Sequence, residues 1–123
     1  MPKEGFSLSK IKVNKSGLVW LLSENNGCIL VLDSLYTTKI FNKKSKTLNA
    51  SAVYSVYEDE QKNSWLLTNN GLTLVRAAKP NQPINYFSNQ AGKASSFHTA
   101  VELDDEVWFG GSNGIIAKYS KKG

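Results

Sequence analysis

Side chains that could take part in acid–base or metal chemistry are few in this sequence. The 123 residues include one histidine, His98, and one cysteine, Cys28. A metal ion or an activated nucleophile needs several converging groups, which a single imidazole or thiol does not supply. We therefore expect no metal and no cofactor. His98 is interpreted as an ordinary residue of a loop or strand start, and Cys28 as a small buried hydrophobic residue.

Two acidic pairs, Glu58-Asp59 and Asp104-Asp105, are the other candidates for chemistry. Paired carboxylates can hydrolyse glycosides or bind calcium. Both pairs, however, stand in polar segments where Asp commonly accepts hydrogen bonds from the backbone of a turn. The hydroxyls of Ser95 and Ser96 have no His and Asp at a recognisable triad spacing. No catalytic residue is predicted, and we expect the chain not to be an enzyme.

The net charge of +5 comes from 15 basic and 10 acidic residues, and Arg76 is the only arginine. Lysines cluster at residues 39–46 and 118–122, among Asn, Ser and Thr. Nucleic-acid surfaces usually combine arginines with stacking aromatic rings, so we interpret these clusters as solvated loops and expect no nucleic-acid partner. No apolar run approaches the roughly 18–20 residues of a membrane helix, so no membrane contact by this segment is expected.

A repeat of about 44 residues must position these side chains. Three tryptophans, Trp20, Trp65 and Trp108, lie 45 and 43 residues apart. Each opens a similar string, ending in Asn-Gly and followed by apolar residues: Trp-Leu-Leu-Ser-Glu-Asn-Asn-Gly (20–27), Trp-Leu-Leu-Thr-Asn-Asn-Gly (65–71) and Trp-Phe-Gly-Gly-Ser-Asn-Gly (108–114). Asn-Gly favours tight hairpins, because both residues tolerate positive φ. Repeats of this length, with no helical periodicity, are typical of β-propellers.

Each repeat also predicts a strand before its tryptophan, at residues 9–13, 52–57 and 99–103. A fourth strand is expected at residues 37–41 and 84–87. Consecutive apolar residues within the strands indicate sheets covered on both faces, so all three tryptophans are expected to be buried between sheets. The predicted fold is all-β: a β-propeller fragment of about three four-stranded antiparallel blades. The blades are residues 1–49, 50–93 and a partial one at 94–123, together one propeller unit excerpted from a larger chain.

Residues 56–59 and 63–72 read Val-Tyr-Glu-Asp and Asn-Ser-Trp-Leu-Leu-Thr-Asn-Asn-Gly-Leu. This pattern resembles the two-component regulator propeller repeat, and the third unit matches it as well. The first unit departs from it, with Asn14 in place of the Asp and Cys28 after the Gly. The resemblance covers about 110 residues. It implies the periplasmic sensor region of a Bacteroides-type hybrid sensor histidine kinase, whose relatives respond to oligosaccharides. Residues 1–5 lack the apolar core of a signal peptide, so an export signal would lie outside this chain.

The best candidates for ligand contact are polar residues in the turns between second and third strands, near the connecting loops at residues 43–51 and 88–96. They are Asn25, Asn26, Asn69, Asn70, Ser112 and Asn113. Amide and hydroxyl groups suit sugar hydroxyls, although turn formation alone also explains the Asn residues. The tryptophans could stack on sugars, but their place in apolar strands favours packing between blades.

The leading hypothesis is a non-enzymatic extracytoplasmic sensor, a ligand-binding propeller segment of a two-component signalling protein that responds to oligosaccharides. A protein-interaction propeller is the alternative, although the Gly-His and Trp-Asp dipeptides of WD repeats are absent. A propeller lyase or hydrolase is the second alternative, and it would need a convergent His/Glu/Asp cluster. Ligand identity, total blade number and signalling direction stay open.

Three blades cannot close a propeller ring, which usually has about four to eight. The two terminal blades should therefore each expose an apolar face. Exposed patches of several hundred Å² normally mark interfaces. We expect self-association through these open blade faces.

Overall fold

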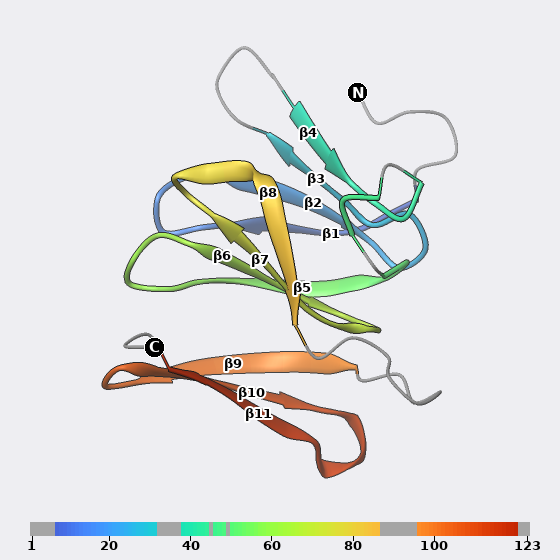
Figure 1. Cartoon of the computed structure of the whole chain (residues 1–123). Helices are drawn as coiled ribbons and strands as arrows, with labels where there is room; N and C mark the ends of the chain where they lie inside the picture. The colour runs from blue at the N-terminus through green and yellow to red at the C-terminus, as the bar shows by residue number, and fades with distance from the viewer. Residues whose placement is uncertain (1–6, 32–37, 45, 49, 87–95, 121–123) are drawn as a thin grey trace.

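The structure, a computed structural model, describes residues 7–31, 38–44, 46–48, 50–86 and 96–120, with only the backbone for Pro80, Asn81 and Asn113. These residues form eleven strands in three antiparallel sheets (Figure 1). The first sheet has the order β1 (Leu8–Val13), β2 (Val19–Ser23), β3 (Cys28–Val31), β4 (Thr38–Phe41). The second has the order β5 (Val53–Glu58), β6 (Ser64–Thr68), β7 (Gly71–Arg76), β8 (Lys79–Tyr86). The third contains β9 (Phe97–Leu103), β10 (Glu106–Gly111) and β11 (Ile116–Ser120), with β10 in the middle. The predicted all-β fold of blade-like four-stranded meanders is confirmed.

The predicted strand limits need one correction. The predicted fourth strand at 84–87 corresponds to β8, which begins earlier, at Lys79. Arg76 pairs with Lys79 across a two-residue turn, so the hairpin closes sooner than its polar sequence suggests. The predicted strand ends at Thr37 and Phe87 lie outside the described residues.

Positive φ in the turns after the tryptophan strands falls on the glycines alone. Gly27 has φ +77° and Gly71 has φ +90°, whereas the Asn before each keeps negative φ. A Cβ on Gly27 would lie 2.1 Å from the carbonyl oxygen of Phe41, so only glycine fits there. In the third sheet the turn differs from the prediction, because the 3-10 helix η1 (Ser112–Gly114) replaces the tight hairpin.

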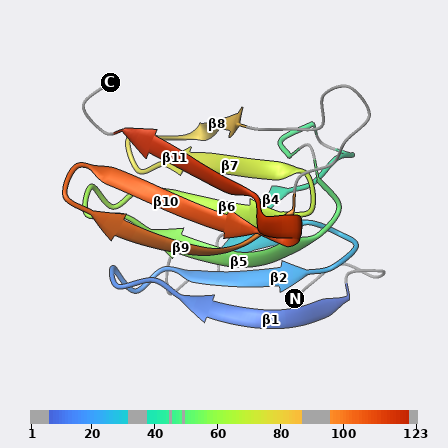
Figure 2. The ribbon, with the colours of Figure 1, turned by 90° about the horizontal axis from the view of Figure 1, so that it is seen from below.

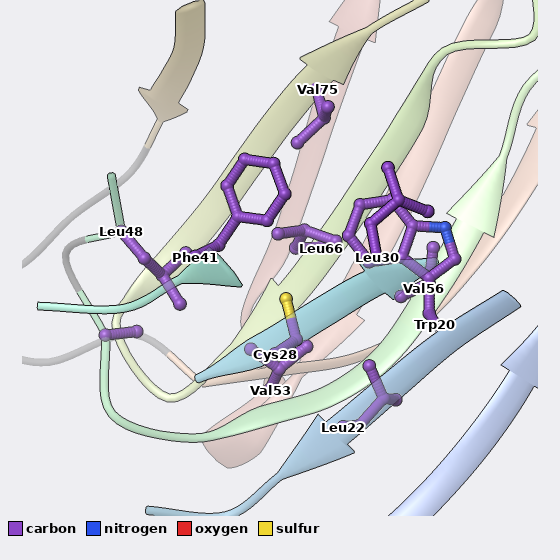
Figure 3. Close-up of a cluster of buried hydrophobic side chains, with 11 residues drawn as sticks. Trp20, Leu22, Cys28, Leu30, Phe41, Leu48, Val53, Val56, Leu66 and Val75 are labelled. Atoms are coloured by element: carbon purple, nitrogen blue, oxygen red, sulfur yellow. The ribbon is translucent and has the colours of Figure 1, made fainter. Parts of the chain in front are cut away.

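The three sheets stack face to face, with the second between the other two (Figures 1 and 2). Two apolar clusters fill the two spaces between them. The first joins the first and second sheets (Figure 3); its largest members are Trp20, Leu22, Leu30, Phe41, Leu48 and Leu66. The second joins the second and third sheets; its largest members are Trp65, Leu67, Leu72, Leu74, Phe97 and Phe109. Cys28 lies in the first cluster, as predicted, and burial raises the pKa of its thiol.

The prediction that all three tryptophans are buried is correct for two of them. Trp20 and Trp65 are fully buried between sheets, whereas Trp108 is only half-buried. Lys118 Nζ lies 5.3 Å from the centre of the Trp108 ring. At both sheet–sheet joints, the face with the tryptophan packs against the next sheet. Trp108 is only half-buried because no described sheet packs on that face of the third sheet.

Carboxylates link each sheet to the turn region of the preceding one. The backbone N–H and hydroxyl of Ser16 donate to the two oxygens of Glu58. Glu102 likewise accepts from the backbone N–H of Glu60, in the β5–β6 turn, over 3.3 Å, and from the hydroxyl of Tyr57, near the end of β5, over 2.7 Å. Burial, reinforced by this hydrogen bond, raises the pKa of the Tyr57 hydroxyl, which keeps its proton as a donor. Glu58 and Glu102 hold equivalent register positions, opposite the residue before each tryptophan.

Asp59 organises the turn between β5 and β6. Its Oδ1 accepts hydrogen bonds from the backbone N–H groups of Gln61 and Asn63, at 2.9 and 3.0 Å. Its Oδ2 accepts from the indole Nε1 of Trp65 at 3.2 Å. These contacts agree with the interpretation of Asp59 as a residue that accepts hydrogen bonds from the backbone of its turn.

Asn14 stands six residues before Trp20, as Asp59 does before Trp65. The buried Nε1 of Trp20 has no hydrogen-bond partner among the described residues, and the amide of Asn14 donates to Ser64 Oγ instead. We predict that Asn14→Asp provides Trp20 with an acceptor and raises the free energy of unfolding by about 1 kcal/mol. Urea unfolding followed by tryptophan fluorescence measures this. Asn14→Ala is the control and should destabilise, and an Asp variant no more stable than the parent would contradict the prediction.

Candidate functional site

The turns between second and third strands share one rim of the molecule with the loops that connect successive sheets. Gly27 N donates to Ser51 O over 2.9 Å, which joins the β2–β3 turn to the loop that precedes β5. Ser112 N donates in the same way to Ser96 O over 3.0 Å, beside the start of β9. Because these bonds tie the backbone of turn and loop together, side chains from both stretches of sequence meet on this rim.

A hollow of about 260 Å³ opens on this rim beside the first sheet. It is the candidate functional site. Its walls come from the β2–β3 turn and from the loop after β4. The lining residues are Asn25, Asn26, Gly27, Asn42, Lys43, Lys44, Ala50 and Ser51. The structure thus brings two of the predicted site residues, Asn25 and Asn26, together with the predicted connecting loop at 43–51.

Ser23, buried at the end of β2, holds the two asparagines of this turn. Its Oγ accepts from the backbone N–H groups of Asn25 and Asn26, at 3.2 and 3.1 Å. With both of those bonds accepted, the hydroxyl donates to Asn25 Oδ1 over 2.8 Å. Asn26 Oδ1 accepts from the backbone N–H of Ser7 over 3.0 Å. Ser23 was not predicted as part of the site, although a Ser whose hydroxyl can accept from the backbone two and three residues later, an ST motif, is a recognisable turn signal.

The other predicted site residues lie in the corresponding turns of the next two sheets. Asn69 Oδ1 accepts from Ala52 N and its Nδ2 donates to Ser51 Oγ, both at 3.1 Å. Both ends of the Asn69 amide therefore support the loop beside the hollow. The backbone N–H of Asn70 donates to Thr68 Oγ1 over 3.0 Å. Ser112 begins η1, and the side chain of Asn113 lies outside the described part.

His98 and Ser112 form a second polar group on the rim, between the second and third sheets. The His98 ring stacks on Tyr54 with centroids 4.4 Å apart, and Ser112 Oγ lies 3.3 Å from His98 Nε2. This pairing could not be predicted from the sequence, since Tyr54 and His98 belong to different repeats. Ser95 lies outside the described residues. In the described ranges, no group of three or more His, Cys, Asp or Glu side chains is arranged to hold a metal ion.

The acidic pairs predicted as turn residues are not brought together. Glu58 and Asp59 are buried and engaged at the end of β5, while Asp104 and Asp105 are exposed in the β9–β10 turn. Asp104 has φ +54°, a conformation that Asp tolerates better than most residues. No helix in the part of the chain that the structure describes is both long and apolar enough to span a membrane.

The chain matches no protein-family model and no curated protein. It is similar to solved extracellular domains from B. thetaiotaomicron. One belongs to BT3049, described as a hybrid two-component system, with a TM-score of 0.66, 15% identity, and coverage of 93% of this chain and 15% of that one. A structure of BT4673, also described as a hybrid two-component system, has a TM-score of 0.68, 15% identity, and coverage of 98% and 16%. A second structure of BT4673, described as a one-component system, has a TM-score of 0.64, 16% identity, and coverage of 98% and 15%.

The chain therefore spans only 15–16% of the length of these structures. Identity at this level establishes a shared fold. This chain has the fold of a propeller-blade segment that also occurs in the extracellular domains of B. thetaiotaomicron signalling proteins.

Proposed function

We propose that this chain is a ligand-binding segment of the extracytoplasmic, periplasmic region of a two-component sensor, with no catalytic activity of its own. The observation that carries the proposal is the fold, which the chain shares over 93–98% of its length with extracellular domains described as parts of signalling systems. In this proposal the parent protein contains a histidine kinase, and residues 1–49, 50–93 and 94–123 are the extents of its three blades here.

An oligosaccharide is the proposed ligand class, and the rim with the hollow is the proposed contact surface. Asn25 and Asn26 line the hollow, and in this proposal the contact surface continues through the corresponding turns, at Asn70, Ser112 and Asn113. Amide groups match sugar hydroxyls, since each amide both donates and accepts hydrogen bonds. Asn69 supports this surface from behind, because its amide is used by Ser51 and Ala52.

The test is binding of a panel of oligosaccharides to the chain, measured by calorimetry, with chromatography of the same samples to detect cleavage. We expect binding without cleavage. Asn25→Asp keeps the oxygen that Ser23 contacts but removes the amide donor, and it should weaken binding by about tenfold, as the loss of one hydrogen bond does. Asn85→Asp on β8 is the matched control, because the contact of Asn85 Oδ1 with Thr73 survives the change. Cleavage products, or an Asn25→Asp variant that binds as the parent does, would count against the proposal.

We also propose that copies of this chain associate through the two open faces of the stack. Six large hydrophobic residues of the outer sheets are exposed: Leu8, Ile11, Val13, Val101, Leu103 and Ile116. The first open face, on the first sheet, includes Ile11 and Val13. The last open face, on the third sheet, includes Val101, Ile116 and Trp108, since Val101 is the register partner of Trp108.

A further inference from the structure

Asn25 and Asn26 offer the hollow mainly hydrogen-bond donors, because the oxygen of each amide already accepts a bond from the protein. Asn25 Oδ1 accepts from the Ser23 hydroxyl, and Asn26 Oδ1 accepts from the backbone N–H of Ser7. A backbone N–H can only donate, so the Asn26 atom that faces Ser7 must be the oxygen. Each amide is left with its NH₂ group, for which no acceptor occurs within the described ranges.

The wall formed by the loop after β4 also offers hydrogen-bond donors. The carbonyl oxygen of Ser51 accepts from Gly27 N, and its Oγ accepts from Asn69 Nδ2, which leaves the Ser51 hydroxyl proton to donate. Lys43 and Lys44 line the hollow and are exposed. Among the described residues, neither lysine forms an ion pair with a carboxylate, whereas Lys118 pairs with Glu106.

None of the described residues that line the hollow is acidic, and two of them are lysines, so the described lining has a net positive charge. The nearest acidic residue in the turn sequence, Glu24, is not part of the lining. A site with several N–H and O–H donors and two ammonium groups favours an anion with several acceptor oxygens, since charge-assisted hydrogen bonds are about twice as strong as neutral ones.

We infer that the hollow binds an anionic group, a carboxylate or a sulfate ester, of an acidic saccharide. Lys43 and Lys44 would supply the charge, and the amides of Asn25 and Asn26 would donate to the same oxygens. This inference deepens the proposed function and rests on it for the saccharide part of the ligand. The asparagines alone would suit neutral sugars, and the two lysines make the difference.

Galactose, galacturonate and galactose 6-sulfate test the inference, because they share one ring and differ in the group at C6. Inorganic sulfate is the fourth probe. Each is titrated into ¹⁵N-labelled chain and followed by NMR at the backbone amides of Gly27, Lys43, Lys44 and Ser51 and at the side-chain amides of Asn25 and Asn26. We expect both charged sugars and sulfate to shift these resonances, galactose to bind at least tenfold more weakly, and salt to weaken the charged complexes by screening.

The variant Lys43→Gln/Lys44→Gln should weaken binding of the charged probes by about 10- to 100-fold, as loss of charged hydrogen bonds does. The matched control is Lys15→Gln/Lys62→Gln, which removes the same charge from two exposed lysines in the turns before β2 and β6. It should leave binding unchanged. A control that weakens binding equally would show a general charge effect and overturn the inference.

The remaining outcomes separate the two proposals. If galactose binds as well as the charged sugars and ignores the lysine substitutions, the inference fails while saccharide binding stands. If sulfate binds at the hollow but neither charged sugar binds more tightly, the anion site stands and the saccharide class falls. If none of the four probes shifts these resonances, both fail.

Discussion

Replacing Trp65 by alanine is expected to lower the free energy of unfolding by about 3–5 kcal/mol, the range for truncating a large buried aromatic side chain. Trp65 is fully buried at the joint between the second and third sheets. Its ring contacts Phe109 and Tyr119 with centroid distances of 4.9 and 4.8 Å. Domains of this size are stable by about 5–15 kcal/mol, so this loss removes a large share of the total stability.

The substitution also removes the indole that donates to Asp59 Oδ2, and so leaves a buried carboxylate oxygen without this donor. Trp65→Phe keeps most of the ring volume and loses only this bond, so it should cost clearly less than Trp65→Ala. Trp108→Ala is the matched control, because Trp108 occupies the same place in its repeat but is half-buried; it should cost about 1–2 kcal/mol. Urea unfolding at one fixed protein concentration gives all three values. Equal losses for Trp65→Ala and Trp108→Ala would contradict this account of the joints.

Self-association of the chain at micromolar concentration is the second large effect expected. At both described joints, the tryptophan face of one sheet packs against the opposite face of the next. The last open face is a tryptophan face, because it contains Trp108, and the first open face is the opposite face of the first sheet. The two open faces are therefore complementary between copies. A joint of this type would bury on the order of 1,000 Å², within the range of specific interfaces. Two copies would supply six sheets, a common blade number for a closed propeller.

The first open face differs from the internal joints in one position that favours association. Val13 holds the same register position as Glu58 and Glu102, opposite the residue before each tryptophan. Val13 is 63% exposed and Val101, across the proposed joint, is 51% exposed. Burial of apolar area contributes about 25 cal/mol per Å², although the entropy of association opposes much of it.

Sedimentation equilibrium of two variants, Val13→Lys and Val101→Lys, tests this pairing. Each variant alone should be monomeric, because each lacks one of the two faces that a joint requires. An equimolar mixture should form a one-to-one complex through the two faces that remain intact. Gln61→Lys, in the exposed turn before β6, adds the same charge elsewhere and should associate as the parent does. A monomeric parent would exclude association, and a Val101→Lys variant that still dimerises would show that first faces pair with each other.

The sequence alone was sufficient to predict the strands and their grouping into sheets. Antiparallel strands joined by short turns pair with their chain neighbours, so the interactions that decide each sheet lie within about 44 residues. The spacing of Trp20, Trp65 and Trp108, and the Asn-Gly turns, report these local interactions directly. The rim was predictable for the same reason, because the turns and loops of a repeated meander recur at one end of each sheet.

The burial and hydrogen bonding of side chains between sheets could be known only from the tertiary structure. Trp108 has the local sequence of a buried tryptophan, yet it is half-buried because burial depends on whether another sheet follows. Two further features depend on how one repeat packs against another. They are the hydrogen bonds from Ser16 to Glu58 and the lack of a described hydrogen-bond partner for the indole nitrogen of Trp20. The hollow could be predicted only in part from the sequence, which indicated Asn25, Asn26 and the loop at 43–51. Only folding placed Lys43 and Lys44 opposite those amides, because the bond from Gly27 to Ser51 joins segments that are 24 residues apart in the chain.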